Sequence, residues 1–189
     1  MEWAALAAQK ALAVDPVLVL GVGRSVEGAF LLLLGPWTFK GPSRKAAAKR
    51  SLALALVVAA CGIACLWVWK HVIPFPPPGL PTQWSRPAAG WGPFLFTACM
   101  ASPLVEELVF RGLLYRNMRQ RWSFPACTAA ISLAFAGLHL LFGSPFFVPF
   151  LGSLLFCAAY EKEKIILAPL LLHMLGNGII FLSPFWLSG

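Results

Sequence analysis

The chain has 189 residues, of which 59% are hydrophobic and only 12% are charged, with a mean hydropathy of +0.77 and a formal net charge of +8. A soluble domain carries about 25% charged residues, so this chain lacks the polar surface of a water-soluble globule and belongs in a bilayer. The basic residues lie in short stretches between apolar runs and are not interleaved with aromatic residues, which argues against a nucleic-acid partner.

Six apolar segments approach the roughly 20 residues that a transmembrane helix needs. The first is interrupted by Arg24 and Glu27, which lie three residues apart and can pair on one helix face. This segment either crosses the bilayer or lies in its interface. We therefore expect an all-α polytopic membrane protein of about six transmembrane helices, or five if the first is interfacial. The six segments are residues 16–37, 51–69, 91–115, 124–142, 146–160 and 165–187.

The connections between these segments predict the orientation. Basic residues are concentrated in residues 38–50, 116–123 and 161–164, whereas the long connection 70–90 and the short link 143–145 carry few or none. The positive-inside rule places the three basic segments in the cytoplasm and both termini outside. If the first segment does not cross, the N-terminus is cytoplasmic and the rest is unchanged. The residue usage favours a multi-pass protein of a bacterial inner membrane.

The third predicted span contains the charged residues Glu106, Glu107 and Arg111. Each charge at a helix centre costs about 2.5–3.5 kcal/mol on insertion scales, so these residues pair, lie near the interface or serve a function. Glu107 and Arg111 are four residues apart in the favourable order for an ion pair. Glu106 points about 100° away from Glu107 and is a candidate general base. The alternative is a helix end whose acidic side chains reach the cytoplasmic headgroups.

Two later spans contain further polar residues. His139 lies in the fourth span, and His173 and Asn177 lie four residues apart on one face of the sixth. Polar groups inside a membrane usually face the bundle interior or a water-filled cavity, so these side chains can hold a water and an oxyanion together with Glu106. Helix rise places Glu106 about 15 Å and His173 about 12 Å from the cytoplasmic edge. His139 comes out deeper, at about 22 Å.

Three motifs follow one another along the chain: Glu106–Glu107–x–x–x–Arg111, Phe135–x–x–x–His139 and His173–x–x–x–Asn177. In this order, each on a predicted span, they resemble the CAAX-type and bacteriocin-processing intramembrane proteases, the CPBP or Abi family. The resemblance covers residues 91–189, which we expect to form the catalytic helices. Residues 1–90 carry no assigned motif and are expected to be an N-terminal membrane region.

The resemblance implies an intramembrane endopeptidase that cleaves a membrane-associated protein or peptide near the cytoplasmic face. Glu106 would activate the attacking water with help from His139, while His173 and Asn177 would stabilise the oxyanion. The neighbouring glutamate–arginine pair would orient Glu106. Family members often have eight helices, so a shorter chain would leave the catalytic chamber open on one side or closed by a second copy of the chain.

Several alternatives stay open. Glu106, His139 and His173 could ligate zinc with a fourth position free; no His-Glu-x-x-His helix is present, and the resemblance favours a mechanism without a cofactor. The protein could also be a non-enzymatic immunity factor or scaffold. A transporter is disfavoured because two spans, residues 51–69 and 146–160, carry no ionisable side chain apart from cysteine and groups at their edges. Prenylated CAAX proteins, bacteriocin leaders and C-terminal sorting tails are all candidate substrates, with the last two favoured by bacterial residue usage.

Overall fold

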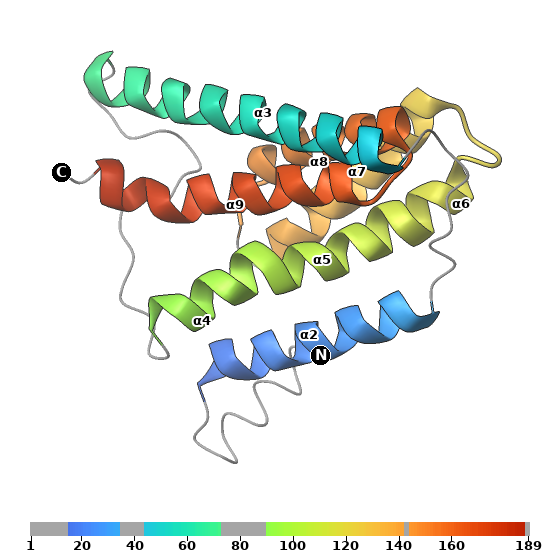
Figure 1. The fold of residues 1–189 in the computed structure, drawn as a ribbon, viewed down its shortest axis with the longest axis horizontal. Helices are drawn as coiled ribbons and strands as arrows, with labels where there is room; N and C mark the ends of the chain where they lie inside the picture. Colours follow the sequence, from blue (N-terminus) through green and yellow to red (C-terminus); the bar gives the residue numbers. More distant parts are fainter. Residues whose placement is uncertain (1–14, 35–43, 73–89, 142–143, 188–189) are drawn as a thin grey trace.

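The computed structural model describes residues 15–34, 44–72, 90–141 and 144–187 (Figure 1). Within these ranges all regular secondary structure is helical, which confirms the all-α prediction. Three of the helices also carry apolar side chains on outward faces, where Leu33, Leu141 and Phe147 are 84%, 78% and 74% exposed. Such faces suit a lipid environment, because soluble proteins rarely expose large contiguous apolar surfaces to water.

Each of the six predicted spans corresponds to a helix or a continuous series of helical segments. The third span is one such series from α4 to α6, in which two segments are π-helical. The described elements are α2 (Pro16–Leu34), α3 (Arg44–Val72), α4 (Trp91–Phe96), η1 (Thr97–Ala101), α5 (Ser102–Glu107), η2 (Leu108–Tyr115), α6 (Arg116–Met118), α7 (Phe124–Leu141), α8 (Phe147–Glu163) and α9 (Leu167–Leu187).

Four helices in the described ranges are long and apolar enough to cross a membrane, namely Lys45–Val72, Trp91–Met118, Phe124–Leu141 and Leu167–Phe185. This finding confirms a polytopic membrane protein. The helices α2 and α8 are not among the four, and α8 has only 17 residues. The crossing of the first segment therefore stays a prediction. The pair predicted within it is present, because Arg24 Nη1 lies 3.1 Å from Oε2 of Glu27.

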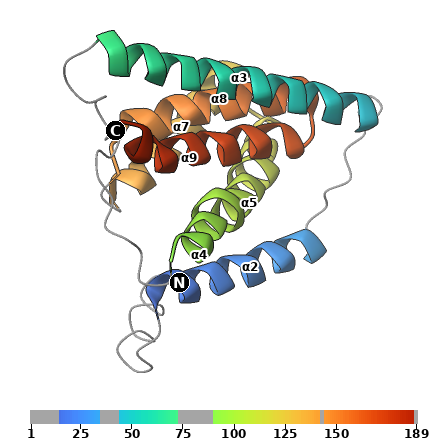
Figure 2. The same ribbon diagram turned by 60° about the vertical axis from the view of Figure 1, so that its left-hand side comes forward.

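Figures 1 and 2 show α3 running beside α9, with α7 and α8 forming the remainder of that side of the bundle. The helical series from α4 to α6 crosses next to α9, and α2 lies on its far side. Two glycines bring α2 close to this series: a Cβ on Gly21 would overlap the side chain of Thr97, and one on Gly28 would lie 3.3 Å from Leu104. Close backbone approach at small residues is the usual way in which membrane helices pack.

One end of the bundle carries a cluster of ion pairs. Arg50 on α3 lies 2.7 Å from Glu163 at the end of α8, and Arg119, just after α6, lies 2.9 Å from Glu161. Tyr115 also donates a hydrogen bond to Glu161. Described residues from all three segments predicted to be cytoplasmic therefore lie at one end of the bundle, as the alternating orientation requires.

Candidate active site

The two carboxylates of the first motif lie between the two π-helical segments. Glu106 and Glu107 end α5, with η1 before it and η2 after it. A π-helical turn adds one residue relative to an α-helix and commonly marks functional sites. Of the two π-helical segments, η1 contacts α9, and η2 contacts α7 and α8.

Glu107 and Arg111 form the ion pair that their spacing predicts. Oε1 of Glu107 lies 2.9 Å from Nη1 of Arg111, and both side chains are 0% exposed. The second guanidinium nitrogen, Nη2, donates to Oγ of Ser153 on α8 at 2.6 Å. The guanidinium also lies over the rings of Phe135 and Phe156, 5.0 and 5.2 Å from their centroids. The charge is thus held by a carboxylate, a hydroxyl and two aromatic faces, which compensates for its burial.

His173 connects this ion pair to Glu106. Its Nδ1 lies 2.8 Å from Oε1 of Glu107, and its Nε2 lies 3.7 Å from Oε2 of Glu106. The ring is only 4% exposed and stacks on Phe156 with centroids 4.8 Å apart. A carboxylate paired with an arginine accepts hydrogen bonds, so Nδ1 of His173 is the donor.

His139 approaches Glu106 from α7. Its Nε2 lies 3.9 Å from Oε2 of Glu106, while Nδ1 lies 2.9 Å from the carbonyl oxygen of Phe135. A carbonyl only accepts, so Nδ1 of His139 is also a donor. In the neutral state both histidines therefore present an Nε2 lone pair to Glu106. We refer to these two Nε2 atoms and Oε2 of Glu106 as the acceptor trio.

With both histidines neutral, none of the three atoms of the acceptor trio carries a hydrogen that it could donate to another. Oε2 of Glu106 is buried and has no hydrogen-bond partner among the described residues. Separations of 3.7 and 3.9 Å are too long for direct hydrogen bonds. The arrangement therefore suits a small donor, such as water, that gives a hydrogen to the carboxylate.

Asn177 lies one helical turn beyond His173 and contacts η1. Its Nδ2 donates to the carbonyl oxygen of Ala98 at 2.8 Å. The sequence explains why this carbonyl is free: the N–H of Ser102 bonds to Thr97, and the next residue, Pro103, has no N–H. The amide keeps a second N–H, so Asn177 holds α9 to η1 and still has a donor to offer.

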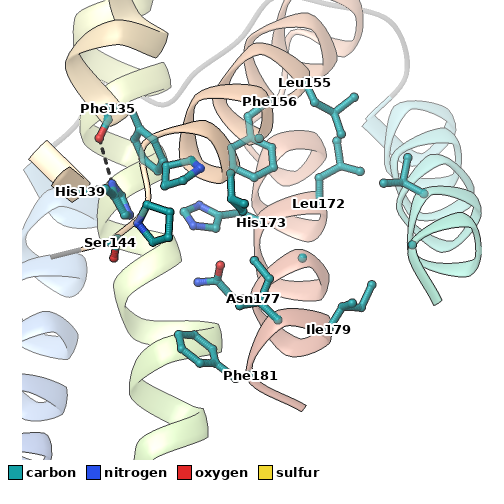
Figure 3. A pocket seen from close by; sticks show the side chains of 18 residues that line it. Phe135, His139, Ser144, Leu155, Phe156, Leu172, His173, Asn177, Ile179 and Phe181 are labelled. Carbon is teal, nitrogen blue, oxygen red and sulfur yellow. Dashed lines mark hydrogen bonds between the residues drawn. The ribbon is translucent and has the colours of Figure 1, made fainter. Parts of the chain in front are cut away.

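A cavity of about 680 Å³ extends from the two histidines and Asn177 along α9 (Figure 3). His139, His173 and Asn177 point toward it together, and Phe181 lies further along. Its remaining walls, from α3, α8 and α9, are largely apolar and include Val58, Gly62, Leu155, Leu172, Ile179 and Ile180. The cavity also reaches Ser144 and Pro145 in the link between α7 and α8. A chamber with a polar end and a long apolar wall suits a substrate with an apolar segment.

The structure thus brings together Glu106, His139 and His173. His139, His173 and Asn177 line the cavity, and Glu106 lies behind the two histidines. His139 lies near Glu106 although the estimate from helix rise placed it deeper in the membrane. That estimate assumes parallel helices, whereas helices that cross at an angle can bring residues of different estimated depth together. Sequence reasoning missed Ser153 and Phe156 on α8. A serine in an otherwise apolar span was the only signal for Ser153, and nothing in the sequence singled out Phe156.

Comparison with known families agrees with this geometry. Residues 88–179 match the family model described as Type II CAAX prenyl endopeptidase Rce1-like. This segment is Rce1-like. The match confirms the CAAX-type family that the three motifs predicted, and it includes every residue of the acceptor trio as well as Asn177. The match supports, in general terms, the activity of a membrane protease. No curated protein and no solved structure matches the chain.

Proposed function

We propose that this protein is an intramembrane endopeptidase in which Glu106 activates a water bound at the acceptor trio. The observation that carries the proposal is the buried, unpartnered Oε2 of Glu106 facing the Nε2 atoms of His139 and His173. A water has two hydrogens, so it can donate one to Oε2 of Glu106 and the other to Nε2 of His139. A carboxylate within reach of that water is suited to remove its proton.

In the first step the water oxygen attacks the carbonyl carbon of the scissile peptide bond, and one water proton passes to Glu106. The carbonyl π electrons move to its oxygen. Asn177 donates its second N–H to this oxyanion, a type of contact worth about 3–4 kcal/mol in a water-poor site. His173 can donate from Nε2 only as an imidazolium, because Nδ1 is already committed to Glu107. It would therefore join Asn177 as a donor to the oxyanion only after the neutral ring of the resting site has gained a proton at Nε2.

In the second step the carbon–nitrogen bond breaks, and Glu106 returns its proton to the leaving nitrogen. His139 assists by holding the water against Glu106 through Nε2. The 2.9 Å bond from its Nδ1 to Phe135 fixes the ring for this task. The products are a new carboxyl terminus and a new amine.

Zinc is the alternative occupant of the same position. Ligands at 2.0–2.1 Å in a tetrahedral site lie about 3.3 Å from one another, so the atoms of the trio would have to approach by roughly 0.5 Å. Among the residues that the structure describes, no three histidine, cysteine, aspartate or glutamate side chains are grouped so that they could hold a metal ion. We therefore propose a reaction without a cofactor, with activity that is retained in the presence of chelators.

The proposal includes an orientation in a bacterial inner membrane. The end with the Arg50–Glu163 pair faces the cytoplasm, and the scissile bond reaches Glu106 from that side. From His173 to Phe181 the cavity wall runs eight residues along α9, or about 12 Å, away from that end. An apolar segment of a membrane-associated substrate would occupy this part. A leader peptide and a C-terminal sorting tail both have such a segment, as does a prenylated C-terminus.

The test is a comparison of protein termini in the membrane fraction by mass spectrometry. Cells would express the wild type, Glu106→Gln or the matched control Glu27→Gln, which removes a carboxylate from α2. We expect a set of new termini that is present with the wild type and the control and absent with Glu106→Gln. Protein levels are matched by quantifying a tag.

A second measurement separates the remaining functions. A peptide covering an identified cleavage site is incubated with purified protein, with and without a chelator. Loss of cleavage on chelation and its return with zinc would replace the water mechanism by the zinc one. If Glu106→Gln leaves all termini unchanged at equal expression, the protein is the non-enzymatic scaffold or immunity factor instead.

A further inference from the structure

The helix α8 carries none of the predicted site residues, yet it contacts the centre of the site. Oγ of Ser153 accepts a hydrogen bond from Nη2 of Arg111 at 2.6 Å, and its carbonyl oxygen accepts a second at 3.3 Å. Ser153 is 0% exposed. A short bond between a buried hydroxyl and a guanidinium is a charge-assisted bond, stronger than one between neutral groups.

This bond limits how Arg111 can turn. Nη1 of Arg111 is bound to Glu107 and Nη2 to Ser153, and the guanidinium carbon lies over the rings of Phe135 and Phe156. The two ends of a rigid planar fork cannot move independently. Removal of Oγ would leave Nη2 with the longer contact to the carbonyl oxygen of Ser153, and the guanidinium could then tilt relative to the two rings.

The position of Arg111 in turn determines that of His173. Both groups bond to the same atom, Oε1 of Glu107, at 2.9 and 2.8 Å. A shift of this oxygen would move the imidazole and change the 3.7 Å separation between its Nε2 and Glu106. Phe156, three residues after Ser153 on α8, supports the same imidazole by stacking. One face of α8 therefore contacts the site at two points.

We infer that Ser153 is a positioning residue of the active site, acting on His173 through Arg111 and Glu107. The inference rests on the proposed function for its catalytic consequence. Displacement of a reacting group by as little as 1 Å can cost about 100-fold in rate. At metal centres, loss of a hydrogen-bond partner of a ligating side chain typically costs about 10- to 100-fold, and we expect a loss of the same order here.

The experiment compares Ser153→Ala with Ser132→Ala. Ser132 is also fully buried, on α7, and is not a hydrogen-bond partner of Arg111. Purified protein is assayed on a peptide that covers a cleavage site found in the comparison of protein termini. We expect Ser153→Ala to lower kcat about 10-fold or more with KM changed less than about 3-fold, while Ser132→Ala keeps both values. Ser153→Thr, which retains the hydroxyl, should recover most of kcat.

A measurement that needs no substrate accompanies the kinetics. Nitrogen-15 spectra of histidine-labelled protein in detergent report the tautomer of each ring. We expect His173 to have its proton on Nδ1 in the wild type and in Ser132→Ala, and to lose this single state in Ser153→Ala. An unchanged His173 signal together with an unchanged kcat in Ser153→Ala would overturn the inference.

A double-mutant cycle addresses the case in which Ser153→Ala is poorly folded. If Ser153 acts through Glu107, then adding Ser153→Ala to Glu107→Gln lowers kcat no further, and Ser153→Thr behaves like the wild type. Effects that multiply, or a loss of kcat that follows only the loss of folded protein in a melting curve, contradict the inference. Failure of the proposed function is distinct, because it appears as termini that do not respond to Glu106→Gln, whatever the state of His173.

Discussion

Nδ1 of His173 lies 2.8 Å from Oε1 of Glu107, so the ring nitrogen that remains to face Glu106 is Nε2. Glu107, the second glutamate of the motif, thereby contacts both a residue of its own helical series and a residue of α9. It neutralises Arg111 four residues away and fixes the tautomer of a histidine 66 residues away. The two adjacent carboxylates have different tasks because successive residues of a helix point about 100° apart.

The first prediction separates the structural task of Glu107 from its catalytic one. Arg111→Met leaves a buried carboxylate without its charge partner and should lower the free energy of unfolding by about 3–5 kcal/mol. The double variant Glu107→Leu/Arg111→Met removes both charges and should regain most of that stability. It should stay inactive, because Nδ1 of His173 then has no acceptor. Melting curves in detergent and peptide cleavage measure the two effects.

An active double variant would contradict the role given to Glu107. Equal loss of stability in the single and the double variant would show instead that the site tolerates no apolar replacement. The expected pattern, in which stability returns and activity does not, distinguishes an orienting carboxylate from a purely structural ion pair.

The second prediction concerns Asn177 as a hydrogen-bond donor. Asn177→Asp keeps the size of the side chain but removes both N–H groups, and it places a carboxylate beside the oxyanion. Loss of one such donor costs about 100- to 1,000-fold in kcat. The control is Asn117→Asp, which changes the only other asparagine, exposed near the polar end of the bundle. An unchanged kcat in Asn177→Asp would reduce Asn177 to a structural contact with Ala98.

Relationships within one helix were predictable from the sequence. The ion pairs Arg24–Glu27 and Glu107–Arg111 follow from spacings of three and four residues, and both are present. The six helical segments follow from the length of the apolar runs. These predictions succeed because helix geometry alone fixes which side chains are neighbours.

Contacts between helices were not predictable in the same way. The bonds from His173 to Glu107 and from Arg111 to Ser153 depend on how far α8 and α9 are shifted along the series from α4 to α6. A shift of one turn would exchange the partners while leaving every spacing in the sequence unchanged. The three motifs named residues that the structure brings close together, but the bonds that His173 and Ser153 form depend on the packing of the helices.

The third prediction tests how α2 packs. Gly21→Ala places a Cβ against the Thr97 side chain, so we expect α2 to be displaced and the melting temperature to fall by several degrees, since overpacking costs about 1–3 kcal/mol. The compensating change Thr97→Ala should restore it, because the next atom, Cβ of Thr97, would lie 3.7 Å from the new methyl group. Gly92→Ala, with no neighbour within 4 Å, is the control. A Gly21→Ala variant as stable as the control would show that α2 does not pack on η1 in the membrane.

The last prediction concerns acid stability at the polar end of the bundle. Glu161 lies outside the predicted spans and accepts hydrogen bonds from Arg119 and Tyr115, with Lys164 3.0 Å away. The hydrogen bond from Arg119 is the largest cause that lowers the pKa of Glu161 from 4.5 to about 2. A carboxyl whose pKa is lower in the folded than in the unfolded state stabilises the folded protein at pH values above its unfolded pKa. That contribution is lost as the pH falls from the unfolded pKa toward the folded one.

The wild type should therefore melt at a higher temperature than Glu161→Gln at pH 6–7, by a few degrees. The difference should shrink as the pH falls from about 4.5 toward about 2. Arg119→Gln, which removes the main cause of the shift, should show a smaller dependence over the same range. A difference that stays constant from pH 7 to pH 3 would mean that Glu161 acts through the shape of its hydrogen bonds and not through its charge. In that case the ion pairs that join α8 to the segment after α6 would hold this end of the bundle together equally well in acid.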